Sequence, residues 1–217
     1  PKGRIMKQLH FRISGPLLML DNNQTADPRN QYAKELTAIN KAMKSKTADK
    51  NALLEQQSQK LVEAGCYYNN QLGMHLPEKC IRGSVIDGAK LHRLGTAITK
   101  YCFFGGNSAL KYKGPQTPQE ISTDPRFRYD TIIRNKTNGA SLPITRTVIP
   151  DWSCEFTINI IQNTKLDSDM LIQAVVDAGL YCGIGASRKF SFGRYDVELK
   201  NAKGKWVPQT NQAAAAK

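Results

Sequence analysis

The sequence predicts an α+β fold with a ferredoxin-like, or RRM-like, β-α-β-β-α-β core, inserted helices after the first strand and a projecting β-hairpin thumb. Three observations lead to this prediction. Residues 8–14, 154–161 and 191–200 alternate apolar and polar side chains, as half-buried strands do. Residues 81–101 and 167–179 repeat apolar side chains at helical spacing. Residues 30–64 are rich in Ala, Lys, Glu, Gln and Leu and lack Pro and Gly, which favours further helices.

Length and composition indicate one globular domain. The chain has 217 residues, of which 40% are apolar and 23% charged. We expect a single domain over residues 1–205, with a helical insertion at 22–65, a thumb insertion at 104–150 and a flexible tail at 206–217. No run of about 18 apolar residues and no signal-peptide core are seen, so we expect a cytoplasmic protein without a membrane partner.

The charge balance predicts a polyanionic partner. The chain has 31 basic and 18 acidic residues, a net charge of +13, and such an excess draws a protein to nucleic acid. The five cysteines are widely spaced without a C-x-x-C, which favours free thiols over a zinc site. The three histidines are scattered, so we expect no metal or cofactor unless the protein is a nuclease that uses a divalent metal.

The first strand has Leu9, Phe11 and Ile13 on one side and polar residues on the other, and we expect it to end at Gly15-Pro16. The residues on its polar side are His10, Arg12 and Ser14, and Arg12 is a candidate nucleic-acid contact. The helical stretch that follows reads as one or two surface helices, broken near residues 44–50.

Residues 81–101 read as one helix with an apolar stripe and a basic ridge. The stripe consists of Leu91, Leu94, Ile98 and Tyr101. The ridge consists of Arg82, Arg93 and Lys100, which share nearly one azimuth at 100° per residue and are candidate nucleic-acid contacts.

Residues 104–150 are irregular, apart from two strands that flank the turn at residues 136–139 and form the thumb. The thumb is basic and supplies no core; its candidate RNA contacts are Arg126, Arg128, Arg134, Lys136 and Arg146.

The remaining core elements follow in order. Residues 154–161 form a strand, and residues 167–179 form an amphipathic helix that Asp167 can cap, Leu171 and Val175 can anchor, and Gly179 can end. In the last strand Tyr195 and Val197 face the core.

The stretch GIGASRKFSFGR, residues 183–194, combines three glycines with basic and aromatic side chains. One interpretation is a tight corner that only glycine permits. The other is an anion site, in which backbone N–H groups approach phosphates, arginines neutralise them and an aromatic ring stacks on a base. The candidate residues are Gly183, Gly185, Arg188, Lys189, Phe190, Phe192 and Arg194. The stretch follows a helix instead of preceding one, so it is neither a dinucleotide fingerprint nor a P-loop.

The order helix, G-x-G-x-x-[RK]-x-x-x-[FY]-G-[RK], strand resembles the glycine-rich loop of the RAMP superfamily, the repeat-associated RNA-binding proteins of CRISPR effector complexes. Residues 76–94, with Cys80, Ile81, Arg82 and Gly83, resemble that family's helix start. Residues 148–160 resemble the strand after the thumb in the CRISPR RNA-backbone subunits. The likeness covers about residues 5–20 and 72–200, and Trp152 stands where glycine is common.

The resemblance implies an RNA-binding protein of antiviral defence, a guide-RNA backbone subunit or a stand-alone relative that multimerises along RNA. It implies that guide RNA, other copies of the chain, other effector subunits and a target RNA or DNA are its partners. Two alternatives stay open: an endoribonuclease of the same superfamily, and a viral mimic or inhibitor that docks onto an RNA–protein complex. Catalysis is the less favoured reading; its candidate residues are Asp21, Asp27, His10 and His92.

Overall fold

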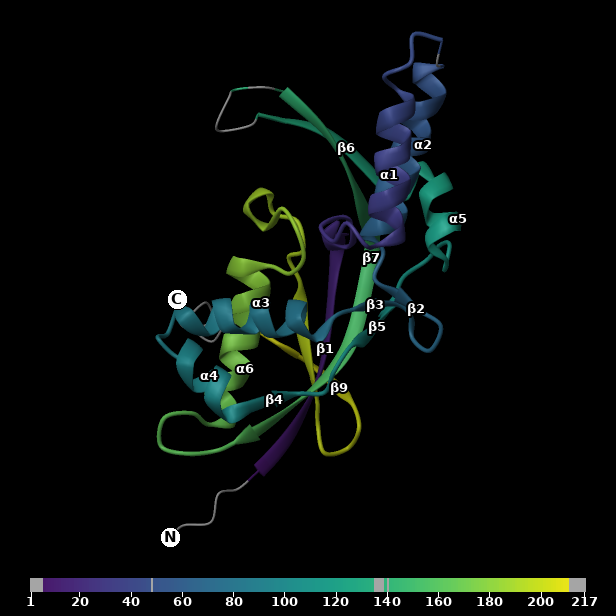
Figure 1. The fold of residues 1–217 in the computed structure, drawn as a ribbon. Helices are drawn as coiled ribbons and strands as arrows, with labels where there is room; N and C mark the ends of the chain where they lie inside the picture. Colours follow the sequence, from purple (N-terminus) through teal and green to yellow (C-terminus); the bar gives the residue numbers. More distant parts are fainter. Residues whose placement is uncertain (1–5, 48, 135–138, 140, 211–217) are drawn as a thin grey trace. The chain divides into compact units, whose positions relative to one another are not determined.

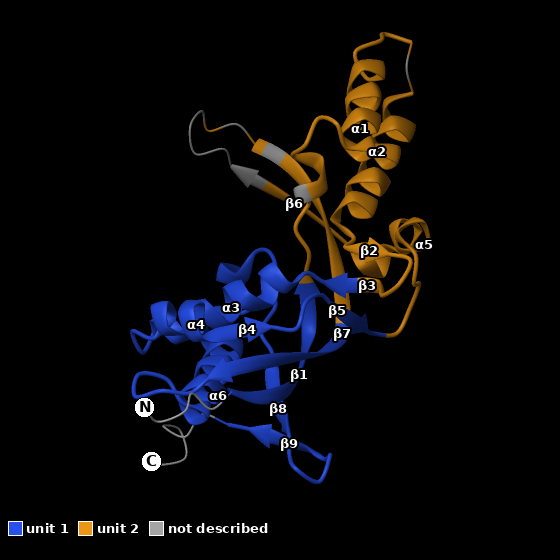
Figure 2. Ribbon diagram, turned by 60° about the horizontal axis from the view of Figure 1, so that its bottom comes forward, with its two compact units in different colours: residues 1–18, 75–112, 151–217 blue, residues 19–74, 113–150 orange. Residues whose placement is uncertain are grey.

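The computed structural model describes residues 6–47, 49–134, 139 and 141–210, and it is an α+β protein of helices and antiparallel strand pairs (Figure 1). Where the sequence predicted one domain, the chain forms two compact units (Figure 2). Unit 1 comprises residues 1–18, 75–112 and 151–217, and unit 2 comprises residues 19–74 and 113–150. The strands β1 (Met6–Met19) and β7 (Ser141–Ile161) each contribute residues to both units.

Unit 1 is a sheet with helices packed beside it. Its strands lie in the order β3-β5-β7-β1-β8-β9, and β4 also pairs with β7. The strands other than β1 and β7 are β3 (Gly73–Leu76), β4 (Cys102–Phe104), β5 (Ser108–Lys111), β8 (Asp196–Lys200) and β9 (Trp206–Gln209). The helices are α3 (Glu78–Lys90), α4 (Gly95–Tyr101) and α6 (Ser168–Asp177), followed by the π-helical turn η3 (Ala178–Cys182) and the short 3-10 helix η4 (Arg188–Phe190).

The core of unit 1 lies between this sheet and α3 and α6. The alternation predicted for the strands is confirmed, since Phe11, Ile13, Ile158 and Ile160 are all buried. Phe11 pairs in register with Leu199, and Cys102 with Ile160, both in antiparallel ladders. The predicted N-cap Asp167 accepts a hydrogen bond from the Met170 N–H, and Leu171 and Val175 of α6 are fully buried.

Three boundaries predicted from the sequence are wrong. β1 does not end at Gly15-Pro16 but continues to Met19, because Gly15 lies against the Arg194 carbonyl instead of making a turn. Residues 104–111, expected to be irregular, include the end of β4 and all of β5. Residues 206–209, expected to be a flexible tail, form β9, which pairs with β8. Residues 211–217 lie outside the described part.

The helix predicted over residues 81–101 is two helices. α3 ends at Lys90 and α4 begins at Gly95, and Arg93 between them has a left-handed backbone with φ 60°. Leu91, placed on the apolar stripe, is exposed, while Ile98 is buried as expected. Arg82 and Lys100 therefore stand on different helices and Arg93 on neither, so the predicted single basic ridge does not form.

Unit 2 is built on a helix pair and a hairpin. The expected break in the helical insertion is confirmed, with α1 (Gln31–Ala42) and α2 (Lys50–Gly65) capped by Asn30 and Asp49. The hairpin strand β6 (Arg128–Arg134) pairs with the first half of β7 in the register Thr131–Ile144. The smaller elements are η1 (Asn23–Thr25), β2 (Tyr68–Asn69), α5 (Pro118–Thr123) and η2 (Pro125–Phe127).

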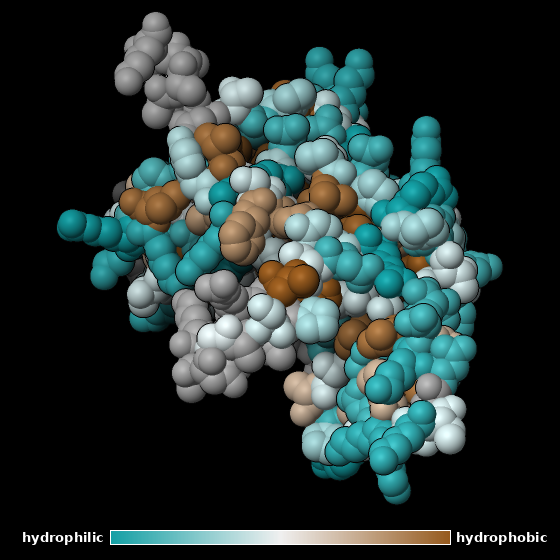
Figure 3. Space-filling model, turned by 90° about the horizontal axis from the view of Figure 1, so that it is seen from above, coloured by the Kyte–Doolittle hydropathy of each residue, from teal (hydrophilic) through white to brown (hydrophobic). Residues whose placement is uncertain are grey.

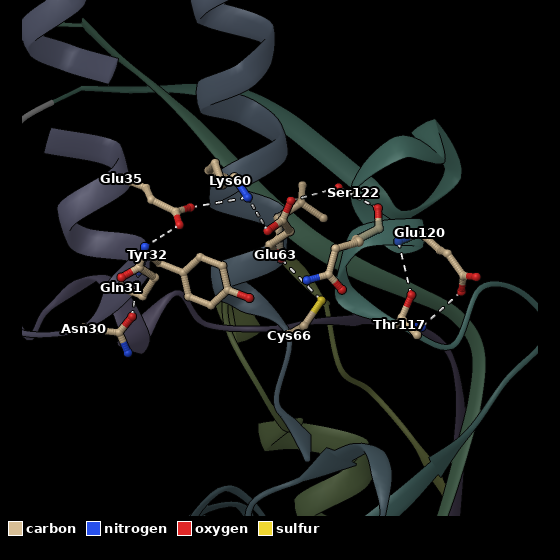
Figure 4. Close-up of polar contacts among 12 residues, drawn as sticks. Asn30, Gln31, Tyr32, Glu35, Lys60, Glu63, Cys66, Thr117, Glu120 and Ser122 are labelled. Carbon is tan, nitrogen blue, oxygen red and sulfur yellow. Dashed lines mark hydrogen bonds and ion pairs between the residues drawn. The ribbon is translucent and has the colours of Figure 1, made fainter. Parts of the chain in front are cut away.

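A buried carboxylate joins α1, α2 and α5 (Figure 4). Glu63, 6% exposed, accepts a hydrogen bond from Lys60 Nζ at 2.8 Å and one from Ser122 Oγ at 3.4 Å, and Lys60 also forms an ion pair with Glu35 at 3.3 Å. Burial, with the nearby Glu63 charge, raises the pKa of Tyr32. The helical insertion was expected to be a surface addition, but it has a buried polar centre of its own.

Candidate nucleic-acid interface

The glycine-rich stretch is a strained loop between η3 and β8. Gly183, Gly185 and Gly193 have φ values of 74°, 81° and 69°, and the non-glycine residues Ser187 and Ser191 have φ values of 54° and 67°. Left-handed backbone in non-glycine residues is disfavoured and concentrates at functional sites. Glycine adopts positive φ without strain, so the strain lies at the two serines, and a simple corner does not need them in this conformation. The backbone therefore favours the binding interpretation over the corner.

The base of this loop is fixed to the sheet and to α3. The Gly193 N–H donates to the Leu17 carbonyl at 2.9 Å, and the Ile184 N–H donates to the Gly193 carbonyl at 2.8 Å. A Cβ on Gly193 would lie 1.8 Å from the Ile184 carbonyl oxygen, so only glycine fits there. Gly179 was expected to end the preceding helix, but the helix continues as the π-helical turn and Gly183 follows it with positive φ.

Ser84 of α3 is a supporting residue that the sequence analysis missed. Its hydroxyl donates to the Gly183 carbonyl at 2.8 Å and lies 3.0 Å from the Tyr195 hydroxyl. Burial raises the pKa of Tyr195, so this phenol stays neutral and hydrogen-bonds to Ser84, which in turn holds the start of the loop. The available signal was a serine three residues after Ile81, on the buried side of the helix.

The tip of the loop presents an aromatic ring and a cation. Phe190 is 78% exposed and Lys189 is exposed beside it, whereas Phe192 is half-buried. A single exposed apolar side chain is ordinary on a protein surface, but a ring beside a cation offers a face on which a base can stack.

Arg188 and Arg194 were both candidate phosphate contacts, and the structure gives them different surroundings. Arg188 Nη1 donates to Asp87 Oδ2 at 2.9 Å, so its charge is paired. Arg194 is half-buried, and its Nη1 has no hydrogen-bond partner within the described residues, as is also true of the indole Nε1 of Trp152. A buried guanidinium nitrogen without an acceptor is costly, and an oxygen ligand would satisfy it.

The other predicted RNA contacts are mostly ion-paired. In unit 2, Arg126 pairs with Asp124, Arg128 with Glu55 and Asp130, and Arg146 with Asp21. In unit 1, Arg82 pairs with Glu78, and Arg12 with Glu155 and Glu198. The side chain of Arg134 and all of Lys136 lie outside the described residues. The paired arginines offer phosphate less than their number suggests, because each carboxylate competes for the same cation.

The sheet face that carries Arg12 is not an open platform. The Arg12 guanidinium carbon lies 4.3 Å from the centre of the Trp206 ring, and its nitrogens contact the two glutamates. Trp206 belongs to β9, which the sequence analysis assigned to the tail. Lys200 at the end of β8 and Lys203 and Lys205 in the following turn are basic residues that were also missed.

The candidate catalytic residues do not form one centre. Asp21 pairs with Arg146 and Asp27 with Arg29, whose hydrogen bonds lower the pKa of Asp27 in an ordinary turn. His10 is exposed on the same sheet face as Arg12, whereas His92 Nε2 contacts the buried Asp177 Oδ2 of α6 at 2.5 Å. Among the described residues, no group of three or more His, Cys, Asp or Glu side chains suits a metal ion.

The five cysteines are free thiols, and burial raises the pKa of Cys66, Cys102 and Cys154 to about 12. No helix in the described part of the chain has the length and apolar character needed to span a bilayer. On the face drawn in Figure 3, hydrophilic side chains predominate and apolar ones stand in small separate groups.

Fold and site together define an α+β protein with a strained loop of basic and aromatic residues. Neither a protein-family model nor a curated protein matches the sequence. One solved structure with a similar fold is the cryo-EM structure of the Type III-B Cmr-beta bound to cognate target RNA, with a TM-score of 0.52 and 10% sequence identity. The match covers 95% of this chain and 61% of that one, so the chain spans about three fifths of its neighbour. At this identity the similarity concerns the fold.

Proposed function

We propose that this protein binds RNA as a RAMP-type protein with a ferredoxin-like core. The strand order β8-β1-β7, with β4 paired to β7, supports the proposal. It is the order in which a ferredoxin-like sheet places its fourth, first, third and second strands. α3 precedes β4 and α6 precedes β8, as the β-α-β-β-α-β plan requires.

The observation that carries the proposal is the glycine-rich loop. Its strained backbone is fixed at the base by Leu17 and Ser84, and its tip presents Phe190 and Lys189. The half-buried Arg194 adds a guanidinium whose Nη1 has no acceptor within the described residues. An exposed ring stacks on any base, and a guanidinium fits a phosphate oxygen, so this pairing favours single-stranded RNA with little base selectivity.

The fold similarity to a chain of the Type III-B Cmr-beta bound to cognate target RNA supports a more particular role. In this role the protein is a cytoplasmic guide-RNA backbone subunit, or a stand-alone relative of one, that multimerises along RNA. Its partners are RNA, further copies of itself and other effector subunits. The net charge of +13 is consistent with an RNA partner, and the number of phosphates that the protein contacts sets its salt dependence.

The test is a salt titration of a labelled 20-nucleotide single strand, followed by fluorescence anisotropy. If about five phosphates are contacted, log affinity falls with log salt at a slope near −3 to −4. The double variant Lys189→Ala/Arg194→Ala should weaken binding by about 1–3 kcal/mol and reduce the slope by roughly one to two units.

Lys165→Ala, a change at an exposed turn after β7, is the matched control and should leave binding nearly unchanged. Circular dichroism checks folding, which Arg194→Ala should preserve because it removes an unpartnered buried group. A double variant that binds RNA like the unaltered protein would show that the loop is only a turn.

A further inference from the structure

The junction between α3 and α4 contains an open hollow of about 470 Å³. Three cationic side chains line it, Lys90 from the end of α3, Arg93 from the linking turn and Lys100 from α4, together with Thr96 and Thr99. None of the described carboxylates lines the hollow, and Ile86 adds an apolar wall. Clefts of this size hold mononucleotide-sized ligands.

The backbone places Arg93 in this hollow at a conformational cost. The Leu94 N–H donates to the Ala89 carbonyl at 2.9 Å, and the Arg93 N–H donates to the Lys90 carbonyl at 3.1 Å. These two bonds define a Schellman motif, whose left-handed residue is usually glycine. Here that residue is Arg93, with φ 60°. An arginine at a position that glycine fits better points to a role for its side chain.

The three cations are only partly neutralised. Lys90 Nζ contacts Asp87 Oδ1 at 2.8 Å, but its side chain is 65% exposed. Lys100 Nζ lies 5.6 Å from the centre of the Tyr101 ring, a contact that leaves its charge available. Within the described residues Arg93 forms no ion pair. A phosphate group, with several oxygens and one or two negative charges, fits such a set better than a single hydrogen-bond acceptor does.

We propose that Lys90, Arg93 and Lys100 form a second anion site, which binds a phosphate group of the RNA backbone or of a free nucleotide. This site is separate from the glycine-rich loop and does not depend on RNA binding by that loop. Two of the three residues predicted to form a basic ridge, Arg93 and Lys100, belong to this site. Lys90 is the third member of the site, and Arg82 is not part of it.

The experiment follows the backbone amide signals of Gly95 and Thr96 by nuclear magnetic resonance in the full chain. The probes are inorganic phosphate, adenosine 5′-monophosphate and a 20-nucleotide RNA with 5′- and 3′-hydroxyl ends, which carries internal phosphodiesters only. Saturable shifts with the mononucleotide alone, or with the mononucleotide and inorganic phosphate, assign a free nucleotide. Shifts with the RNA assign its backbone; either result supports the phosphate site.

Arg93→Gly is the sharpest variant because it removes the charge and relieves the left-handed strain. We expect it to raise Tm by about 2–4 °C and to weaken the saturable shifts at least tenfold. Lys100→Ala should weaken them similarly, and Lys165→Ala should not.

Lys189→Ala/Arg194→Ala should keep the shifts caused by the mononucleotide, which separates this proposal from failure of the glycine-rich loop. The proposal is overturned if none of the three probes shifts Gly95 or Thr96. It is equally overturned if the shifts persist unchanged in both Arg93→Gly and Lys100→Ala.

Discussion

Asp87 shows how one residue sets the charge available at the glycine-rich loop. Its Oδ2 accepts from Arg188 Nη1 at 2.9 Å, and its Oδ1 accepts from Lys90 Nζ at 2.8 Å. Burial raises the pKa of Asp87, but the hydrogen bonds from Lys90 and Arg188 outweigh it and hold the pKa below its usual value. The carboxylate is therefore charged at neutral pH and competes with phosphate for both cations.

Asp87→Asn should therefore tighten RNA binding. Releasing Arg188 from a partly exposed ion pair frees one cation for phosphate, and pairs of this kind are worth up to about 1 kcal/mol. We expect about two- to fivefold higher affinity at low salt and a salt slope steeper by about 0.7. Asp169→Asn makes the same change of net charge on α6 and serves as the control. Equal effects of the two variants would argue that Arg188 does not meet phosphate.

Glu155 forms ion pairs on the sheet face that carries Arg12, and these pairs contribute to the stability of the fold. Its carboxylate accepts a hydrogen bond from Lys111 Nζ at 2.8 Å and pairs with Arg12 at 3.3 Å. The hydrogen bond from Lys111, with Arg12 adding to it, lowers the pKa of Glu155 below the ordinary 4.5 despite partial burial. A lowered folded-state pKa means that the charged form stabilises the fold.

The pH dependence follows from that sign. The contribution of Glu155 is complete above about pH 4.5, its ordinary pKa, and is lost as the pH falls through the lower folded-state value. Glu155→Gln should lower Tm at pH 7 and flatten the loss of Tm between about pH 5 and pH 3. Salt at about 0.5 M should shrink the difference, since the pair is partly exposed. Thermal unfolding scans with unchanged acid sensitivity in the variant would refute this role.

Among the elements, α3 and α6 approach each other closely at a glycine. A Cβ on Gly88 would lie 2.3 Å from the Ala174 carbonyl oxygen and 2.8 Å from the Ala178 Cβ, whereas a Cβ on Gly83 of the same helix meets nothing within 4 Å. Gly88 therefore permits the helix packing that carries Ser84 to the loop.

The two glycines predict opposite effects of the same substitution. Gly88→Ala should destabilise the fold by about 1–3 kcal/mol through overpacking. Gly83→Ala should stabilise it by about 0.5–1 kcal/mol, the difference in helix propensity. Urea unfolding measures both free energies, and each variant is the control for the other. A stable Gly88→Ala protein would mean that α3 and α6 lie further apart.

The sequence predicted correctly those strands and helix ends that depend on neighbouring residues alone. Alternation identified the strands around Phe11 and Ile158, and Asp167 identified the start of α6. The break at Arg93 was missed because its Schellman motif lacks the usual glycine. β9 was missed because it is a four-residue edge strand that contains Pro208.

The candidate site was predicted as a segment, but not in its charge state. Sequence reasoning identified residues 183–194 from their glycines and cations. It treated Arg188 and Arg12 as free because their partners are distant in sequence, Asp87 by 101 positions and Glu155 by 143. Pairings over such separations depend on the tertiary fold, which propensity and spacing do not encode.

For the whole molecule, the proposed assembly along RNA depends on the hairpin of β6 and β7. The prediction that residues 126–147 supply no core is wrong, since Phe127 and Thr147 are fully buried and Thr145 is 7% exposed. Removing all of them would damage unit 2. The distal part is different: Ile132 is 70% exposed and Pro143 is exposed.

A shorter deletion therefore tests assembly without disturbing that core. Thr131 and Ile144 are opposite each other in the ladder, so replacing residues 132–143 by Asn-Gly closes a two-residue hairpin. If the hairpin joins neighbouring copies, the variant should remain a folded monomer with nearly unchanged Tm and should lose multimers on a long single-stranded RNA, as mass photometry would show. The deletion also removes Arg134 and Lys136, so it changes the charge of the hairpin as well as its length.

The matched control is Arg134→Gln/Lys136→Gln in the full-length hairpin. Loss of multimers in the deletion but not in this control assigns assembly to the hairpin itself. Normal multimers in the deletion would exclude the hairpin as the contact between copies.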